Sequence, residues 1–290
     1  MANVETAEEM HRLFNRTAQA YDQSGVAFFV PIARRLVEFA DISRAASVLD
    51  VGCGRGAALL AAAEAVGEDG EVLGIDLSEE MAKYAAEAAR ERGLSHVTVS
   101  VMNGQEPDFP PGRFDAVIGS LSVFIWTRGA ADLAPYARLL RPGGVLALSA
   151  PSFFPTDDGR WGLLPESIYD LLIPFMTPAK KAAGPAYPFA DFADNWLVTP
   201  GSIEKVLTEA GYRDAVVHEE EFRLVVESGA QWVEWTRTTG MRRLWDRIEQ
   251  TEGPGLADEV ARRVDALKGE DGTITTPVPI TYIRARAPQT

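Results

Sequence analysis

Cysteine and histidine are scarce in this chain, which has one Cys and three His in 290 residues. A single cysteine, Cys53, excludes an internal disulfide bond and any metal site built from several cysteines. No apolar run approaches the roughly twenty residues that span a bilayer, and the chain does not open with the apolar region of a signal peptide. We therefore expect a cytoplasmic protein with no membrane partner.

Positive charge is scarce as well, because 28 Lys and Arg stand against 42 Asp and Glu and give a formal net charge of −14. Nucleic-acid backbones are bound mainly by clustered cations. The densest group, Arg237, Arg242 and Arg243, has acidic neighbours in a helix-like context, which is typical of a solvated helix face. We expect no nucleic-acid partner, and the sequence leaves the oligomeric state open.

The sequence also lacks motifs for metal binding and for a nucleophilic catalytic triad. No histidine and carboxylate motif has metal-binding spacing, and Asp157-Asp158 before Gly159 is typical of a turn. We therefore expect no metal ion.

The most informative segment that is present runs from Val48 to Gly56, with the sequence Val-Leu-Asp-Val-Gly-Cys-Gly-Arg-Gly. An apolar, β-branched run followed by glycines predicts a strand and a tight turn that lets a ligand approach the backbone. Residues 57–66, rich in Ala and Leu and closed by Gly67, predict a helix. A second strand ends in Asp76, where a carboxylate can accept hydrogen bonds from both hydroxyls of a ribose.

Three ligand classes compete for this pattern. A P-loop is excluded because no Gly-Lys-Ser or Gly-Lys-Thr closes the turn. A dinucleotide fingerprint fits imperfectly, with Ala57 in its last position. Asp50 favours the third class, because a carboxylate there would repel a pyrophosphate but suits a ligand with an ammonium group.

The rest of the core alternates strand and helix, which predicts a Rossmann-like, doubly wound, mostly parallel α/β sheet. The expected strands cover 47–51, 71–75, 97–101, 114–119 and 144–150, and the expected helices cover 57–66, 79–92 and 129–140. A helix from Thr199 to Ala210, strand-like stretches in 215–226, a helix over 230–250 and a strand over 277–285 should follow. We expect the last strands to form a terminal antiparallel pair.

Three further landmarks follow the glycine turn in order, at residues 101–105, 112–118 and 139–148. With them the chain resembles the class I S-adenosylmethionine-dependent methyltransferases, and it is nearest in pattern to the small-molecule enzymes of ubiquinone and menaquinone biosynthesis. The resemblance covers most of the chain. It implies S-adenosyl-L-methionine as cofactor and S-adenosyl-L-homocysteine as product.

The same resemblance implies roles for individual residues. Asp50, Gly52 and Gly54 would hold the methionine part, Asp76 the ribose, Leu77 and Met81 the adenine face, and Asn103 and Gly104 the adenine edge, with Ser120 as a further cofactor contact. The family commonly has Asp where Asn103 stands, although an amide oxygen can still accept a hydrogen bond. Many relatives carry a His pair where this chain has Phe124-Ile125, followed by Trp126, which favours an apolar substrate wall.

We interpret the whole chain, residues 1–290, as a single methyltransferase domain. Residues 1–45 are expected to form a helical cap from helices over 5–20 and 26–39, and Tyr21 of this cap is a candidate cofactor contact. Residues 46–150 and 199–290 would form the core. Residues 151–198, rich in proline and aromatics, are expected to form an inserted lid over the substrate or a small satellite core.

Candidate catalytic and substrate-binding residues are few. His11 on the cap is the candidate base, whereas His96 opens a core strand and His218 is remote from the cofactor motifs. The candidate substrate-binding residues are aromatic: Phe124, Trp126, Trp161, Tyr187 and Trp196.

These patterns lead to one main hypothesis and two alternatives. The main one is O- or C-methylation of a small, largely apolar acceptor, as in specialised metabolite biosynthesis. A cyclase-like enzyme that keeps S-adenosylmethionine as a structural part is the second. A nicotinamide-dependent reductase is the third.

Overall fold

The computed structural model describes residues 2–152, 164–176, 196–253 and 255–289. The predicted substrate contacts Trp161 and Tyr187, and much of the predicted lid, lie outside the described residues.

The chain forms two compact units, each assembled from three separate segments. We call them the core unit, Phe29–Phe154, Asp194–Glu220 and Pro279–Thr290, and the accessory unit, Met1–Phe28, Pro155–Ala193 and Glu221–Val278. The second predicted cap helix therefore belongs to the core unit, and residues 221–278 belong with the N-terminal helix. The single-domain organisation with a cap and a lid stays a prediction.

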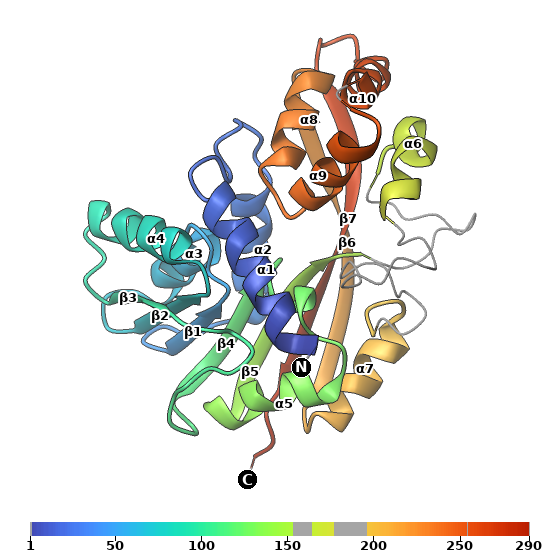
Figure 1. Ribbon diagram of the computed structural model, residues 1–290. Helices are drawn as coiled ribbons and strands as arrows, with labels where there is room; N and C mark the ends of the chain where they lie inside the picture. Colours follow the sequence, from blue (N-terminus) through green and yellow to red (C-terminus); the bar gives the residue numbers. More distant parts are fainter. Residues whose placement is uncertain (1, 153–163, 177–195, 254, 290) are drawn as a thin grey trace. The chain divides into compact units, whose positions relative to one another are not determined.

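Within the described residues, seven strands form one sheet in the order β3-β2-β1-β4-β5-β7-β6 (Figure 1). Their bounds are β1 Ser47–Val51, β2 Glu71–Asp76, β3 Val97–Val101, β4 Phe114–Ser120, β5 Leu140–Pro151, β6 Arg213–Val226 and β7 Ile274–Arg286. The pairs from β3 to β5 are parallel, and β7 is antiparallel to β5. The predicted Rossmann-like, mostly parallel sheet with antiparallel terminal strands is confirmed.

The register aligns the carboxyl ends of the parallel strands at one edge. Asp76 pairs with Val101, and Ser120 pairs with Ser149. The strand order reverses between β1 and β4, because β2 and β3 follow on one side and β5 on the other. Ligands of open α/β sheets bind at such a switch point, beyond the carboxyl ends of the strands.

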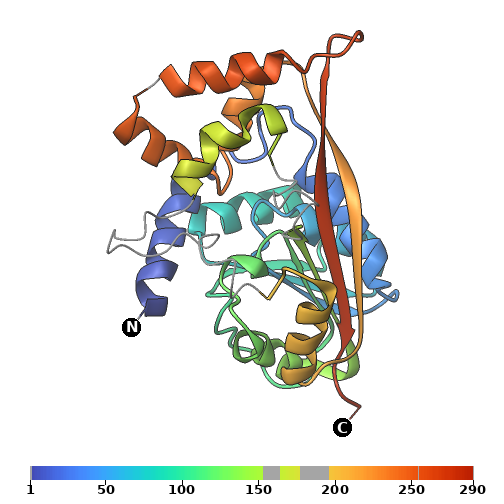
Figure 2. The same cartoon turned by 90° about the vertical axis from the view of Figure 1, so that its right-hand side faces the viewer.

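Helices cover both faces of the core sheet (Figure 2). They are α2 (Phe29–Ala40), α3 (Ala57–Val66), α4 (Glu79–Glu91), α5 (Ala130–Leu139) and α7 (Pro200–Glu209), with a short 3₁₀ turn η1 (Val123–Ile125). Helix α2 packs on α3, β4 and β5, while α5 packs on β4, β5 and α7. The predicted start of α7 is confirmed, because the hydroxyl of Thr199 accepts from the amide of Ser202 in a capping box and Pro200 opens the helix.

The accessory unit contains α1 (Ala2–Thr17), α6 (Glu166–Met176), α8 (Gly229–Arg237), α9 (Arg242–Thr251) and α10 (Gly255–Asp265). Helix α10 packs on α8 and α6, and α6 packs on α9. The prediction of one helix over 230–250 is wrong. The hydroxyls of Thr238 and Thr239 donate to the carbonyls of Trp235 and Thr236, where they compete with helical hydrogen bonds, and Gly240 follows.

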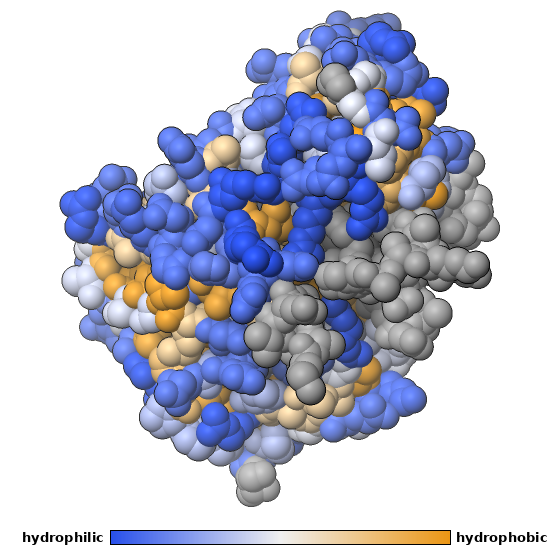
Figure 3. All heavy atoms as spheres, in the orientation of Figure 1, coloured by the Kyte–Doolittle hydropathy of each residue, from blue (hydrophilic) through white to orange (hydrophobic). Residues whose placement is uncertain are grey.

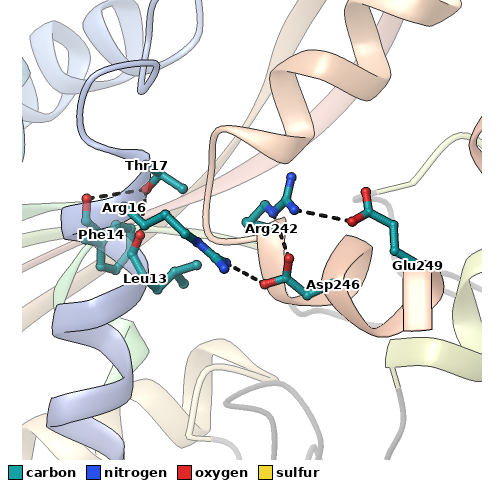
Figure 4. A network of polar contacts seen from close by, with 7 residues as sticks. All are labelled: Leu13, Phe14, Arg16, Thr17, Arg242, Asp246 and Glu249. Carbon is teal, nitrogen blue, oxygen red and sulfur yellow. Dashed lines mark hydrogen bonds and ion pairs between the residues drawn. The ribbon is translucent and has the colours of Figure 1, made fainter. Parts of the chain in front are cut away.

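Ion pairs join α1 to α9 inside the accessory unit (Figure 4). Arg16 contacts Asp246 at 2.5 Å, Arg242 contacts Asp246 at 2.8 Å, and Arg242 also reaches Glu249 at 3.3 Å. Arg243 pairs with Glu9 of α1 at 3.1 Å. Arg237, Arg242 and Arg243 are therefore partly buried, ion-paired residues rather than the solvated face that the sequence suggested.

No helix in the described ranges is both long and apolar enough to cross a membrane. Figure 3 shows a largely hydrophilic face, with apolar surface in the region of β2 and β3 of the core unit, where Val101 is half exposed.

Candidate cofactor site

The glycine turn after β1 is held against the end of β2. The amides of Gly52 and Cys53 both donate to the carbonyl of Ile75, at 2.8 and 3.0 Å. The amide of Gly54 donates to one carboxylate oxygen of Asp76 at 2.8 Å, and the amide of Ser78 donates to the other at 2.9 Å. Asp76 is thereby fixed at the mouth of the turn, with a second lone pair on each oxygen for a ligand.

Two glycines of the turn have left-handed backbones for different reasons. At Gly52, with φ +70°, a Cβ would lie 2.7 Å from the Cβ of Ser122, so close packing excludes a side chain. At Gly54, with φ +53°, a Cβ would meet no atom within 4 Å. The space in front of Gly54 is open, and a ligand can reach the backbone there.

Asp50 is the most unusual residue of this edge. Its side chain is buried in β1, and neither carboxylate oxygen has a hydrogen-bond partner in the described structure. Burial, with the nearby charge of Asp76, raises the pKa of Asp50 to about 8, while the nearby amide of Leu59 opposes the shift without making a hydrogen bond of normal geometry. A buried, unpaired carboxyl group is costly unless a ligand supplies the missing partner.

Burial also raises the pKa of Asp76, against the opposing effect of the amides of Ser78, Gly54 and Leu77. Because burial disfavours the ionised forms, the two carboxyl groups suit a ligand that supplies both hydroxyl donors and a cation.

The residues predicted to face an adenine lie on the neighbouring loops. Met81 is buried in the first turn of α4, where its amide donates to the N-cap hydroxyl of Ser78, and Leu77 is half-buried just before that cap. Asn103 follows β3, and its side-chain oxygen accepts from the amide of Gln105 at 3.0 Å. This hydrogen bond closes a local turn of the loop and holds the Asn103 side chain in place.

The segment after β4 approaches the same loop. A Cβ built on Gly104 would lie 2.8 Å from Val51 Cγ1 and 3.1 Å from the indole of Trp126. Trp126 thus borders the turn that carries Gly104, in addition to being a predicted substrate contact. Phe124 is half-buried in η1, one turn earlier.

Sequence reasoning missed two buried residues that fix this edge. The hydroxyl of Ser122 donates to the carbonyl of Val51 at 2.6 Å, and the hydroxyl of Tyr136 donates to the carbonyl of Gly104 at 2.6 Å. Neither has a motif that could reveal it, because their partners, in β1 and in the loop after β3, are distant in sequence.

A relative identifies the family. The chain is 36% identical over 281 residues to nocamycin O-methyltransferase of Saccharothrix syringae, an alignment that covers 94% of this chain and 97% of the relative. The chain belongs to the class I S-adenosylmethionine-dependent methyltransferases. S-adenosylmethionine is its cofactor.

Further similarities agree with this assignment. The methyltransferase domain family matches residues 48–144 of this methyltransferase. Aklanonic acid methyltransferase DauC of Streptomyces sp. is 42% identical over 146 residues, which cover 50% of this chain and 66% of that protein. The solved structure of the [4+2]-cyclase SpnF is 20% identical with a TM-score of 0.52, and the alignment covers 90% of this chain and 82% of that one, which shows a shared fold alone.

The other predicted site residues of the methyltransferase have local contacts of their own. Ser120, at the end of β4, lies 3.3 Å from the hydroxyl of Ser149. Trp196 of the core unit is buried, and its indole nitrogen has no hydrogen-bond partner in the described structure.

His11 and Tyr21 belong to the accessory unit. The ring nitrogen Nε2 of His11 lies 3.1 Å from the side-chain amide of Asn15, and Tyr21 packs edge-on against Phe14. Their roles toward the cofactor or substrate stay predictions.

The two remaining histidines of the methyltransferase have structural contacts. His96 Nε2 lies 3.3 Å from the carbonyl of Ala63. His218 lies 3.5 Å from Glu220 and stacks on Phe39. In the ranges that the structure describes, no three His, Cys, Asp or Glu residues come together as metal ligands.

Proposed function

We propose that this methyltransferase transfers a methyl group from S-adenosylmethionine to an oxygen atom of a small, largely apolar specialised metabolite. The observation that carries the proposal is the similarity to nocamycin O-methyltransferase over 94% of the chain, which extends beyond the cofactor motifs to the segments predicted to bind the acceptor. A cytoplasmic location stays a prediction of the sequence.

The groups at the sheet edge fit this cofactor. The unpartnered carboxylate of Asp50 would pair with its ammonium group, the oxygens of Asp76 would accept from its ribose hydroxyls, and the open face of Gly54 would let it approach the backbone. We assign Gly52, Leu77, Met81, Asn103, Gly104 and Ser120 to the same site as supporting contacts.

When bound, the cofactor supplies a methyl group already activated by its sulfonium sulfur. The protein's own contribution is to hold the acceptor oxygen in line with that methyl group and to exclude water. Aromatic walls suit this task, and we assign Phe124, Trp126 and Trp196 to the acceptor side, with Trp161 and Tyr187 as sequence-predicted additions.

The placement of the histidines favours an acceptor oxygen that is already ionised. In the core unit, His96 contacts a backbone carbonyl and His218 contacts Glu220. A carboxylic acid loses its proton near pH 4, so it is already ionised at neutral pH and needs no base. The second relative is named for an acid, which agrees with a carboxylate acceptor. His11 stays the sequence-predicted base for an acceptor that must lose a proton.

The cyclase-like alternative is not favoured. SpnF shows that this fold also serves a cyclase, so the fold does not choose between the two activities. The sequence relatives are named as methyltransferases, and they decide for methyl transfer. The same relatives exclude the nicotinamide-dependent reductase.

The test uses the full chain with methyl-labelled S-adenosylmethionine and a panel of largely apolar aromatic carboxylic acids. Each acid is matched with its own methyl ester as the control acceptor. We expect label to enter the acid but not the ester, with one S-adenosylhomocysteine formed per methyl transferred. Mild alkali should release the label from a methyl ester, whereas a methyl ether or a C-methyl group would retain it.

Label that resists alkali would contradict a carboxylate acceptor while preserving methyl transfer. Conversion of an acceptor without formation of S-adenosylhomocysteine would contradict methyl transfer itself. The pH profile of His11→Ala completes the test, since a lost catalytic base lowers kcat by about 100-fold or more over the range in which it acts.

A further inference from the structure

Two hydrogen bonds in series connect the segment after β4 with the loop after β3. The indole Nε1 of Trp126 donates to the hydroxyl of Tyr136 at 3.1 Å, and that hydroxyl donates to the carbonyl of Gly104 at 2.6 Å. Tyr136 lies on α5 and is fully buried. The bond from Tyr136 to Gly104 is buried, and such a bond is costly to break because the partner left behind is shielded from water.

The ring of Trp126 also contacts both glycine-bearing loops. Measured from the position that a Cβ would occupy, its six-membered ring lies 3.1 Å from Gly104 and 3.4 Å from Gly52. Gly52 belongs to the turn after β1, and Gly104 to the loop after β3. One side chain therefore touches two loops of the cofactor edge and, through Tyr136, also fixes the carbonyl of one of them.

Neither bond belongs to the backbone hydrogen bonds of the sheet or the helices. Tyr136 donates from the interior of α5 to a loop that has its own local turn, made by Asn103 and Gln105. The bond therefore adds a constraint on where Gly104 lies, not on whether the loop forms.

We propose that Trp126 and Tyr136 are positioning residues for the nucleoside half of the cofactor site. This proposal rests on the methyltransferase function above. Trp126 holds the loops of Gly52 and Gly104 apart at a set distance, and Tyr136 fixes the orientation of the Gly104 peptide. Removal of either group lets the loop after β3 move, and the adenosine part loses affinity.

The experiment measures binding of two probes to the full chain by calorimetry. One probe is S-adenosylhomocysteine, and the other is 5′-methylthioadenosine, which has the nucleoside but no amino-acid tail. Tyr136→Phe should weaken both by about fivefold to tenfold, the equivalent of one hydrogen bond. The equal loss for both probes would place the effect at the nucleoside.

Tyr212→Phe is the matched control. The hydroxyl of Tyr212 also donates to a backbone carbonyl, that of Leu133 on the same helix α5, at 3.1 Å, and its side chain is also buried. Tyr212→Phe also removes a hydroxyl that donates to a backbone carbonyl, but it leaves the hydrogen bond from Tyr136 to Gly104 in place. We expect a similar fall in Tm for the two variants, but affinities within twofold of wild type for Tyr212→Phe.

Equal affinities for Tyr136→Phe and Tyr212→Phe would overturn the proposal. If Tyr136→Phe fails to fold, Trp126→Phe decides, because it removes the indole donor and leaves the bond from Tyr136 to Gly104 in place. A fall of about threefold for both probes supports the positioning role, and unchanged affinities overturn it. Wild-type protein that binds neither probe would contradict the cofactor assignment, and with it this proposal.

Discussion

Ionisable side chains have opposite surroundings at the cofactor edge and in the accessory unit. At the edge of the core sheet, Asp50 is buried with neither oxygen hydrogen-bonded in the described structure. In the accessory unit, Arg16, Asp246, Arg242 and Glu249 neutralise one another and keep part of their surface in water. A buried ionisable group without a partner indicates that a ligand is expected, whereas a network of ion pairs indicates packing.

The largest effect is expected for Asp76→Ala, a change at the cofactor edge. The change removes the acceptors for the amides of Gly54 and Ser78 and, in the proposed site, the acceptors for the ribose hydroxyls. Because hydrogen bonds to charged groups contribute about 1.5–3 kcal/mol each, we expect S-adenosylhomocysteine to bind about 100-fold more weakly or worse. Calorimetry measures the effect. Glu91→Ala, at the exposed end of α4, is the control, and a loss below tenfold for folded Asp76→Ala would remove the ribose role.

A second test counts the protons that are released when S-adenosylhomocysteine binds. Burial raises the pKa of Asp50 to about 8, so the group is mostly protonated at pH 7 before a ligand binds. The ammonium group of S-adenosylhomocysteine favours the ionised form, and we expect binding at pH 7 to release about one proton. Calorimetry in buffers with different ionisation enthalpies counts it. Asp50→Asn should release none, and an equal release from both proteins would exclude Asp50 as its source.

The same pKa sets the sign of a stability change. The pKa of Asp50 is higher in the folded protein than in the unfolded chain, so folding favours its protonated form. Its contribution to stability is therefore fully present below about pH 4 and is lost as the pH rises through about 8. Without ligand, Asp50→Asn should remove this part of the pH dependence.

The smallest effect belongs to the accessory unit. Asp246→Asn weakens the ion pairs with Arg16 and Arg242, and because these groups are partly exposed the free energy of unfolding should fall by only about 1 kcal/mol. Chemical denaturation at low and high ionic strength measures it, with a smaller loss expected at high salt. Glu209→Gln, from the exposed pair with Lys205, should change stability very little. A large loss of cofactor affinity in Asp246→Asn would erase the contrast and give this network a binding role.

The parallel core could be predicted from the sequence because its signals are local. The strands 47–51 and 97–101 and the helix 57–66 were predicted with the observed bounds, since β-branched runs and glycines mark each boundary. The places of Asp50 in β1 and of Asp76 at the end of β2 were predicted for the same reason, and their roles toward the cofactor stay predictions.

The accessory unit could not be predicted in this way. Helix α6 contains Pro174 and lies in a segment interpreted as irregular, and α10 follows Gly253 without a clear motif. The break between α8 and α9 depends on hydroxyl groups that bond to the backbone, which composition alone does not reveal. Tyr136 and Ser122 escaped prediction because their partners are brought close only by the sheet.

The strands β6 and β7 are each divided between the two units, since the boundaries fall after Glu220 and after Val278. No single proteolytic cut can therefore release either unit as a continuous piece of chain. Strand β5 must wait for β7 to be synthesised before the core sheet is complete, and this long separation in sequence raises the contact order and predicts slow folding. For protein engineering, this means that fragments such as 29–154 lack strands that their own sheet requires, and that domain exchange with a relative must carry both long strands together.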